Sequence, residues 1–313
     1  WPWTLRALGL PLLAPVLLWQ SPRPEAGQFE LLAADIGQGN AVLVRTAGHT
    51  LVYDAGPRLS RESDAGHRVL VPLLRAMGER VDTLVLSHRD TDHTGGALAL
   101  LTTQAQASLL SSIENEHALQ TLRTASRCAT GQHWVWDGVR FEVLHPPLVD
   151  YELARKPNAM SCVLRISNGV HTALLAGDIE QPQEAQLLAG AQPLRADVLL
   201  VPHHGSKTSS SAAFLDAVAP RFALVQSGYR NRFGHPASEV VQRYQQRGIQ
   251  VIDSPHCGAM MWTSAQPQRL LCQRELARRY WHHRAPTVAS APAEGEAARN
   301  LLSSAQESAH AKD

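Results

Sequence analysis

Net charge is the first property that this chain nearly lacks. Its 313 residues carry 29 Lys and Arg against 28 Asp and Glu, which leaves a formal charge of +1 at pH 7. Such a balance gives no overall attraction to nucleic acid or to acidic membranes. The cations are almost all Arg, and several gather late in the chain: Arg269, Arg274, Arg278, Arg279 and Arg284. This group could contact phosphate, or it could belong to a solvated strand and tail.

Cysteine is also scarce, with four residues and no Cys-x-x-Cys pair. The spacing therefore does not predict a zinc site made of thiolates. Cys257 and Cys272 flank a hairpin that we predict from residues 258–263 and 268–271. The two residues could form a disulfide in an oxidising compartment, or they could remain half-buried thiols.

A full-length apolar span is missing too. Residues 7–19 are uncharged and rich in Leu, but about 13 residues are too few to cross a bilayer, which takes roughly 20. No clear signal-peptide cleavage site follows. We expect the end of a transmembrane helix that starts upstream; a signal-peptide remnant or an apolar arm are the alternatives. We thus predict a membrane end and linker over 1–27, one domain over 28–281 and a disordered tail over 282–313.

Apolar segments bounded by turn residues predict strands in two runs, with a few helices in each. The predicted strands are residues 29–35, 40–46, 50–54, 81–86, 139–144, 161–167, 171–176, 198–201 and 222–226. The predicted helices are residues 69–77, a segment after Gly95-Gly96, and residues 182–188, 211–218 and 238–247. This order favours an α+β fold in which two sheets pack face to face with helices outside.

The most informative segment is residues 87–96, Ser-His-Arg-Asp-Thr-Asp-His-Thr-Gly-Gly, directly after the strand 81–86. It places four possible metal ligands in six positions: His88, Asp90, Asp92 and His93. Imidazole and carboxylate at this density suit one or two divalent cations. In an extended loop His88 and Asp90 would share one metal, and Asp92 and His93 would turn toward a second. The alternative is a charged surface loop.

Three further apolar strands end in residues of the same kind. Asp54 follows residues 50–53 and could orient a ligand, while Asp178 follows Gly177 and could bridge two cations. Either could instead be a turn-forming Asp. His203 and His204 follow residues 198–201, and neutral imidazole suits a metal.

Two segments near these histidines could contact phosphate. Ser206 and Lys207 precede further hydroxyl residues that open a helix, which could form a phosphate cradle or could be plain helix capping. His235 lies in the loop 231–236 and could transfer a proton or contact phosphate, unless it is a surface histidine. His145, before two prolines, is left out of the candidate site.

Taken together, these motifs resemble the metallo-β-lactamase superfamily. The resemblance is closer to the C-terminal domain of ComEC-type DNA-uptake channel proteins. It rests on residues 35–41 (Asp-Ile-Gly-Gln-Gly-Asn-Ala), 88–96, 202–209 (Pro-His-His-Gly-Ser-Lys-Thr-Ser) and 234–236 (Gly-His-Pro), and it covers about 29–281. It implies an αββα sandwich with a two-metal site between the sheets. It also implies phosphodiester hydrolysis, to degrade the DNA strand that is not imported during natural transformation.

The resemblance assigns roles to the candidate residues. His88 and Asp90 would hold one metal; Asp92, His93 and one histidine of the 203–204 pair, preferably His204, would hold the second. Asp178 would bridge the two cations, which would lower the pKa of a water nucleophile. Asp92 and His235 are the residues expected to take part in catalysis.

The chain departs from the wider superfamily at two places. Asp90 stands where many members have His, and residues 147–169 contain no His where another ligand would be expected. Asn158 and Ser161 lie there and could contact substrate oxygens. An oxygen-rich donor set favours Mn²⁺, with Zn²⁺ or Mg²⁺ also possible. It also argues against a β-lactam substrate.

Two other functions remain open at this point. A DNA-guiding module of the channel could keep the fold without turnover, although it would not need Asp92, His93 and Asp178. A small-molecule phosphoesterase is the third reading, and the lack of an obvious choline-type aromatic cage argues against a choline ester. The expected partners are DNA, the membrane and other competence proteins. The expected location is the inner membrane, with this domain on its periplasmic face.

Overall fold

The computed structural model describes residues 21–280, which form two mixed β-sheets. The first sheet has the strand order β15-β14-β1-β2-β3-β4-β5-β6. Its strands are β1 (Glu30–Ala33), β2 (Val42–Arg45), β3 (Thr50–Tyr53), β4 (Thr83–Leu86), β5 (Ser108–Ser111), β6 (Ser126–Arg127), β14 (Met260–Thr263) and β15 (Leu270–Cys272). Strands β15 to β3 are antiparallel neighbours, whereas β3 to β6 run parallel.

The second sheet repeats this division, with the order β13-β12-β11-β10-β9-β8-β7. Its strands are β7 (His133–Trp136), β8 (Val139–His145), β9 (Val163–Ser167), β10 (Thr172–Leu175), β11 (Val198–Leu200), β12 (Phe222–Val225) and β13 (Gln250–Asp253). Strands β7 to β10 are antiparallel and β10 to β13 are parallel. Each sheet therefore has a parallel half, whose strands present their carboxyl ends at one edge.

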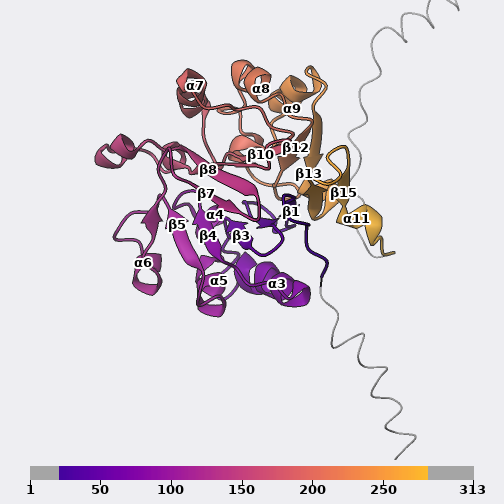
Figure 1. The fold of residues 1–313 in the computed structure, drawn as a ribbon. Coiled ribbons are helices and arrows are strands. Elements are labelled where there is room, and N and C mark those ends of the chain that lie inside the picture. Colours follow the sequence, from indigo (N-terminus) through magenta and orange to yellow (C-terminus); the bar gives the residue numbers. More distant parts are fainter. Residues whose placement is uncertain (1–20, 281–313) are drawn as a thin grey trace, which may run out of the picture. The chain divides into compact units, whose positions relative to one another are not determined.

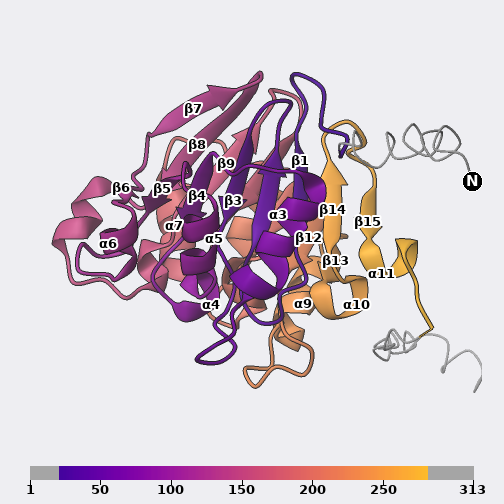
Figure 2. The same ribbon diagram turned by 90° about the horizontal axis from the view of Figure 1, so that it is seen from below.

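Helices cover the outer face of each sheet (Figures 1 and 2). Over the first sheet lie a π-helical turn (Gly66–Leu70) that continues into α3 (Val71–Met77), and α5 (Ala97–Thr103). Over the second lie α7 (Gln181–Ala189), α8 (Ala212–Val218) and α9 (Ser238–Gln245). Short helices complete the described part: α4 (Thr91–Thr94), α6 (Leu119–Leu122), α10 (Ser254–Cys257), α11 (Gln273–Leu276) and the 3₁₀ turns Leu148–Glu152, Asn158–Met160 and Pro202–Gly205.

Three layers of buried apolar side chains hold the four structural layers together. The middle layer, between the sheets, contains Phe29, Phe141 and Trp262. One outer layer lies between the first sheet and helices α3 and α5, and it contains Leu74. The other lies between the second sheet and helices α8 and α9, and it contains Phe214. Strands that face two of these layers are apolar on both sides, as in β3, where all four residues are buried.

This αββα sandwich confirms the predicted fold class. The nine predicted strands are present with ends shifted by a few residues, and Gly78 ends α3 in the left-handed conformation, as predicted. The prediction missed β5, β6, β7 and β13. These strands are short, and β6, β7 and β13 carry few buried residues, so their apolar pattern is weak.

Within residues 21–280, no helix combines the length and apolar character needed to cross a bilayer. The predicted membrane segment at 7–19 and the tail at 282–313 lie outside the described residues.

Candidate metal centre

Four side chains converge at the edge where the parallel strands end. Asp92 and His93 lie on α4 after β4, Asp178 follows β10, and His204 lies in the turn after β11. One ligand atom from each of these residues lies within 4.8 Å of the others. We call these four residues the metal-site cluster.

The distances leave room for a cation between the side chains. His204 Nε2 lies 3.4 Å from Asp92 Oδ2 and 3.5 Å from Asp178 Oδ2. His93 Nε2 lies 3.2 Å from Asp178 Oδ1 and 3.9 Å from Asp92 Oδ2. The cluster therefore presents two imidazole nitrogens and two carboxylates to one point, a donor set that divalent metals accept.

The inward atoms of the cluster satisfy a second test for a metal. His93 Nε2, His204 Nε2 and Asp178 Oδ1 are buried and make no hydrogen bond within the described residues. His88 Nε2 is likewise buried without a hydrogen-bond partner in this part of the chain. Buried polar atoms are normally paired, because leaving one unpaired costs about 1–3 kcal/mol. Several such atoms aimed at one place fit a bound cation.

Asp54 orients His93 from the opposite side of its ring. The buried Asp54 carboxylate lies 2.8 Å from His93 Nδ1 and also accepts hydrogen bonds from the Ser87 amide and hydroxyl, at 2.7 and 2.9 Å. A proton held on Nδ1 leaves Nε2 free for a metal. Asp54 thus contacts His93 on the side of the ring that faces away from the other members of the cluster.

The backbone carbonyl of Gln226, at the end of β12, holds His204 in the same way. His204 Nδ1 lies 2.9 Å from Gln226 O. His203, His204 and Gly205 all have positive φ angles, of 49°, 52° and 81°. Two consecutive non-glycine residues in this conformation are strained, and such strain concentrates at functional sites. A Cβ on Gly205 would lie 2.6 Å from Pro236 Cβ, so Gly205 also permits close packing.

The cluster is an electrostatically negative pocket. Burial lowers the pKa of His93, but the charges of Asp178 and Asp54 outweigh this effect and raise it well above its usual value. The same balance raises the pKa of His204. Burial opposes ionisation of Asp92, yet the nearby His204 ring and the charge of His93 lower its pKa to about 2. A pocket that stabilises positive charge in this way suits a cation.

His88 and Asp90 form a separate pair beside the cluster. His88 Nε2 lies 3.6 Å from Asp90 Oδ2, and His88 is buried while the Asp90 side chain is 44% exposed. The sharing of one metal by His88 and Asp90 stays a prediction. The predicted extended loop is only half correct, because residues 91–94 form α4 and Asp90 precedes it in extended conformation. The helical turn is what aims both Asp92 and His93 inward.

Ser161 has a different position from the one expected. It is fully buried, its hydroxyl accepts a hydrogen bond from the Asp178 amide at 3.1 Å, and it lies 3.4 Å from His88 Nδ1. Burial of Ser161 argues against the expected contact with substrate oxygens, and the Ser87 hydroxyl, at 3.0 Å, lies nearer to His88 Nδ1 than Ser161 does. Asn158 remains half-buried, with its side-chain nitrogen 3.4 Å from His203 Nε2.

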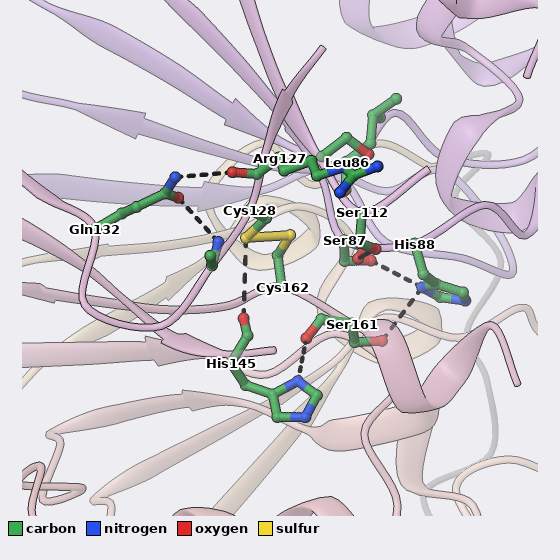
Figure 3. Close-up of a disulfide and its surroundings, with 12 residues drawn as sticks. Leu86, Ser87, His88, Ser112, Arg127, Cys128, Gln132, His145, Ser161 and Cys162 are labelled. Atoms are coloured by element: carbon green, nitrogen blue, oxygen red, sulfur yellow. Dashed lines mark hydrogen bonds between the residues drawn. A yellow bond between two sulfur atoms is a disulfide. The ribbon is translucent and has the colours of Figure 1, made fainter. Parts of the chain in front are cut away.

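A disulfide supports this side of the centre (Figure 3). It joins Cys128 to Cys162, the residue after Ser161. The Cys162 amide donates to Ser87 O at 2.8 Å, and His145 Nδ1 lies 2.9 Å from Ser161 O. The sequence analysis did not pair these cysteines and left His145 out. A spacing of 34 residues carries no local signal of pairing.

His203 lies outside the cluster. Its Nε2 is 3.9 Å from Asp178 Oδ2, and its Nδ1 is 3.3 Å from the Thr208 hydroxyl and 3.4 Å from Glu180. The His235 ring lies beside both histidines, 5.7 Å from His203 and 6.4 Å from His204 between centroids. Burial and the neighbouring histidines lower the pKa of His235 to about 4.

Ser206 and Lys207 do not join the cluster. Ser206 is buried, with its hydroxyl 3.1 Å from that of Thr208, and the exposed Lys207 lies 3.7 Å from Glu239. Ser211 caps α8 through the Phe214 amide, so capping accounts for this serine.

The motif at 35–41 packs against the metal-site cluster. A Cβ on Gly39 would lie 2.1 Å from Asp92 O, and the Asn40 amide donates to the same oxygen at 3.2 Å. Asn40 is buried, and both polar atoms of its side chain have no partner in the described chain. The sequence analysis used this motif only for the resemblance and missed that Asn40 adjoins Asp92.

The layered fold and the Asp and His cluster at its strand ends define a metallo-β-lactamase-type protein. Residues 34–228 match the metallo-beta-lactamase superfamily, and the chain belongs to it. Among solved structures, YhfI from Bacillus subtilis (TM-score 0.50, 14% identity) aligns with 76% of this chain and 100% of its own. Igni18, a metallo hydrolase from Ignicoccus hospitalis (TM-score 0.51, 17% identity), aligns with 75% and 98%. These likenesses concern the fold alone.

Relatives with higher sequence identity include proteins named for competence and recombination, and they confirm the resemblance to ComEC-type proteins. The chain is 38% identical over 267 residues to competence protein ComA of Neisseria gonorrhoeae, covering 82% of this chain and 36% of ComA. It is 35% identical over 228 residues to recombination protein 2 of Haemophilus influenzae, covering 73% and 28%. The chain thus spans about a third of the length of the curated relatives it matches.

Proposed function

We propose that this chain is a metal-dependent phosphodiesterase that cleaves DNA, and that it degrades the strand that is not imported during natural transformation. The convergence of Asp92, His93, Asp178 and His204, with unpartnered atoms facing inward, carries this proposal. The superfamily supports a hydrolase, and relatives named for competence and recombination support DNA as the substrate.

The donor atoms would hold two divalent ions. His88 and Asp90 would hold one, Asp92, His93 and His204 the other, and Asp178 would contact both. When bound, the ions would supply Lewis acids that lower the pKa of water and offset charge on phosphate. Because the first pair has only one imidazole, Mn²⁺ is favoured over Zn²⁺, and Mg²⁺ is a further candidate.

The chain's own residues would orient the phosphodiester. In hydrolysis, a water oxygen bonds to phosphorus, the bond to one ester oxygen breaks, and that oxygen takes up a proton. The His235 ring lies beside His203 and His204, where it would hydrogen-bond a phosphate or leaving oxygen. Asn158 would hold His203 and contact a substrate oxygen.

The test is hydrolysis of labelled single- and double-stranded DNA with Mn²⁺, Zn²⁺ or Mg²⁺. We expect activity with Mn²⁺ that Asp92→Ala and His93→Ala abolish, whereas Glu62→Gln, an exposed carboxylate, serves as a control that retains it. If the protein binds DNA but hydrolyses none with any of the three metals, the proposed nuclease activity is wrong and a DNA-guiding module is favoured. Hydrolysis of small phosphoesters alone would instead favour a phosphoesterase.

We further propose that the domain lies on the periplasmic face of the inner membrane. The two disulfides support an oxidising compartment. Thiol labelling from outside intact cells tests this placement. We expect the partly exposed Cys272 to react only after an added impermeant reductant, and its immediate labelling as a free thiol only after lysis would place the domain in the cytoplasm.

A further inference from the structure

A loop rich in Arg and aromatic residues lies beside the metal-site cluster. It spans residues 228–235 between β12 and α9, and we call it the stacking loop. Phe233 is 53% exposed and Tyr229 is 45% exposed. Each ring has a guanidinium above it: Arg232 lies 4.8 Å from the centroid of Phe233, and Arg230 lies 5.2 Å from that of Tyr229.

An aromatic stack leads from this loop to the cluster. The Phe233 ring is stacked on the His235 ring, with centroids 5.7 Å apart and planes at 23°. His235 is in turn roughly parallel to His204, at 6.4 Å and 21°. The exposed ring of Phe233 is therefore two ring spacings from a member of the metal-site cluster.

The stacking loop is held in its conformation before any ligand arrives. The Asn231 side chain donates to Gly228 O and His235 O, at 3.0 and 2.6 Å, and accepts from the Phe233 and His235 amides, at 3.1 and 3.0 Å. The Gly228 amide donates to Gln38 in the motif at 35–41, at 3.1 Å. Holding exposed aromatic side chains on a braced loop lowers the entropic cost of binding.

The charge of this surface complements a phosphate backbone. Neither Arg230 nor Arg232 forms an ion pair with a carboxylate in the described part of the chain. At the start of α4, Arg58, Arg61 and Thr91 line a hollow in the surface. Figure 2 shows the loop after β3 and the loop between β12 and α9 projecting from the same edge of the molecule. Local positive charge thus flanks the negative metal-site cluster although the whole chain is nearly neutral.

From this arrangement we propose that the stacking loop binds unpaired nucleotides of a single-stranded nucleic acid. Arg232 leaves the face of Phe233 for an adjoining phosphate and a base takes its place on the ring, while Arg230 contacts a neighbouring phosphate. Bases within a duplex have their faces covered by neighbouring pairs, so only an unpaired base can occupy this platform. The inference rests on the proposed function for the scissile phosphate, and it makes single strands the preferred substrate.

The test compares three ligands: an oligothymidine strand, a strand of equal length made of abasic tetrahydrofuran nucleotides, and a blunt duplex. Binding is measured by fluorescence anisotropy in EDTA, where no turnover occurs, and KM and kcat are measured with Mn²⁺. We expect Phe233→Ala to weaken oligothymidine binding about tenfold and to raise its KM. Binding of the abasic strand stays unchanged.

Matched variants separate stacking from charge and from folding. Phe233→Trp retains oligothymidine affinity, whereas Phe233→Leu, which is apolar but not aromatic, loses it. Arg232→Gln weakens both strands equally, because they share the phosphate backbone. Val170→Ala truncates an exposed apolar residue in the turn after β9, at the far end of that strand from Ser161, and changes neither affinity.

Two results would overturn the inference: an equal effect of Phe233→Ala on normal and abasic strands, or duplex binding by the parent protein as tight as single-strand binding. Failure of the proposed function has a different outcome. If no strand is hydrolysed with any metal while oligothymidine binding still depends on Phe233, the nuclease proposal fails and the stacking loop stands as a single-strand binding surface.

Discussion

At the scale of single residues, the centre depends on which nitrogen of each histidine faces the other ligands. Nδ1 of His93 is hydrogen-bonded to the Asp54 carboxylate, and Nδ1 of His204 is hydrogen-bonded to the backbone oxygen of Gln226. Both Nε2 atoms are thereby directed into the metal-site cluster. His203, although adjacent in sequence, has its Nδ1 next to Thr208 and Glu180 instead. The two adjacent histidines, His203 and His204, therefore have different hydrogen-bond partners and different positions relative to the cluster.

Asp54→Asn is expected to weaken Mn²⁺ binding about 10–100-fold. The neutral amide no longer holds the proton of His93 on Nδ1, so Nε2 is less available as a metal ligand. Isothermal titration calorimetry measures the affinity, and circular dichroism verifies that the variant is folded. Glu62→Gln is the matched change of an exposed carboxylate. A folded Asp54→Asn protein with unaltered affinity would contradict the orienting role.

The histidine pair gives a sharper contrast. His204→Ala is expected to remove the metal proposed to be held by Asp92, His93 and His204, since it deletes a nitrogen within 3.5 Å of both Asp92 and Asp178. His203→Ala is expected to leave metal content unchanged. Mass spectrometry of the metal content after dialysis measures both, and the reverse order would show that His203 is the ligand.

At the scale of elements, turns connect the two sheets at the end opposite the metal-site cluster. Asp137, between β7 and β8, accepts hydrogen bonds from the Thr46 hydroxyl and the Gly48 amide, at 2.6 and 2.7 Å, and lies 3.1 Å from His49 Nδ1. These three partners belong to the turn between β2 and β3. The contact thus joins one sheet to the other through a single carboxylate.

Asp137 makes stability depend on pH in a defined window. The hydrogen bond from Thr46 and that from the Gly48 amide lower the pKa of Asp137 from 3.8 to about 2. A carboxylate with a lowered pKa stabilises the folded state when the pH is above its ordinary pKa of 3.8. This stabilisation is lost as the pH falls from about 4 to about 2. Asp137→Asn should lower the free energy of unfolding by about 1 kcal/mol at pH 7, because solvent screens this surface contact and Asn keeps one acceptor oxygen.

Urea denaturation at several pH values measures this effect. The difference between the parent protein and Asp137→Asn should shrink as pH falls through the window. Glu114→Gln, which removes an exposed ion pair with Arg89, is the control and should show little difference. A pH-independent difference for Asp137→Asn would exclude the carboxylate as the cause.

At the scale of the whole molecule, two disulfides reinforce the sandwich at different places. Cys257–Cys272 links α10 to the end of β15, which confirms the pairing that the predicted hairpin allowed. Cys128–Cys162 connects the segment after β6, in the first sheet, with the start of β9, in the second. The second disulfide therefore couples the sheets directly beneath His88.

Removing each disulfide by paired Cys→Ser changes should lower the free energy of unfolding by about 3–4 kcal/mol, and slightly more for the longer Cys128–Cys162 loop. Urea denaturation measures both. Loss of Cys128–Cys162 should also weaken Mn²⁺ binding, whereas loss of Cys257–Cys272 should not. Equal metal affinity in the two variants would contradict support of the centre by the first disulfide.

The sequence by itself determined the sandwich and most of the metal-site cluster. Strand patterns are local, and His88 to His93 are neighbours in the chain, so their convergence needs only one strand end and one helical turn. Asp54, Asp178 and the 203–204 pair were recognisable because each ends an apolar strand. Parallel strands bring such ends to one edge whatever the rest of the fold does.

Only the tertiary structure decided which histidine of the pair faces the cluster and that Ser161 is buried beside His88. It also decided that Cys128 pairs with Cys162 and that Phe233 stacks on His235, next to His204. These relations join residues from different sheets or loops. Packing of the two sheets and the left-handed turn at 203–205 fix them, and neither leaves a periodic pattern in the sequence.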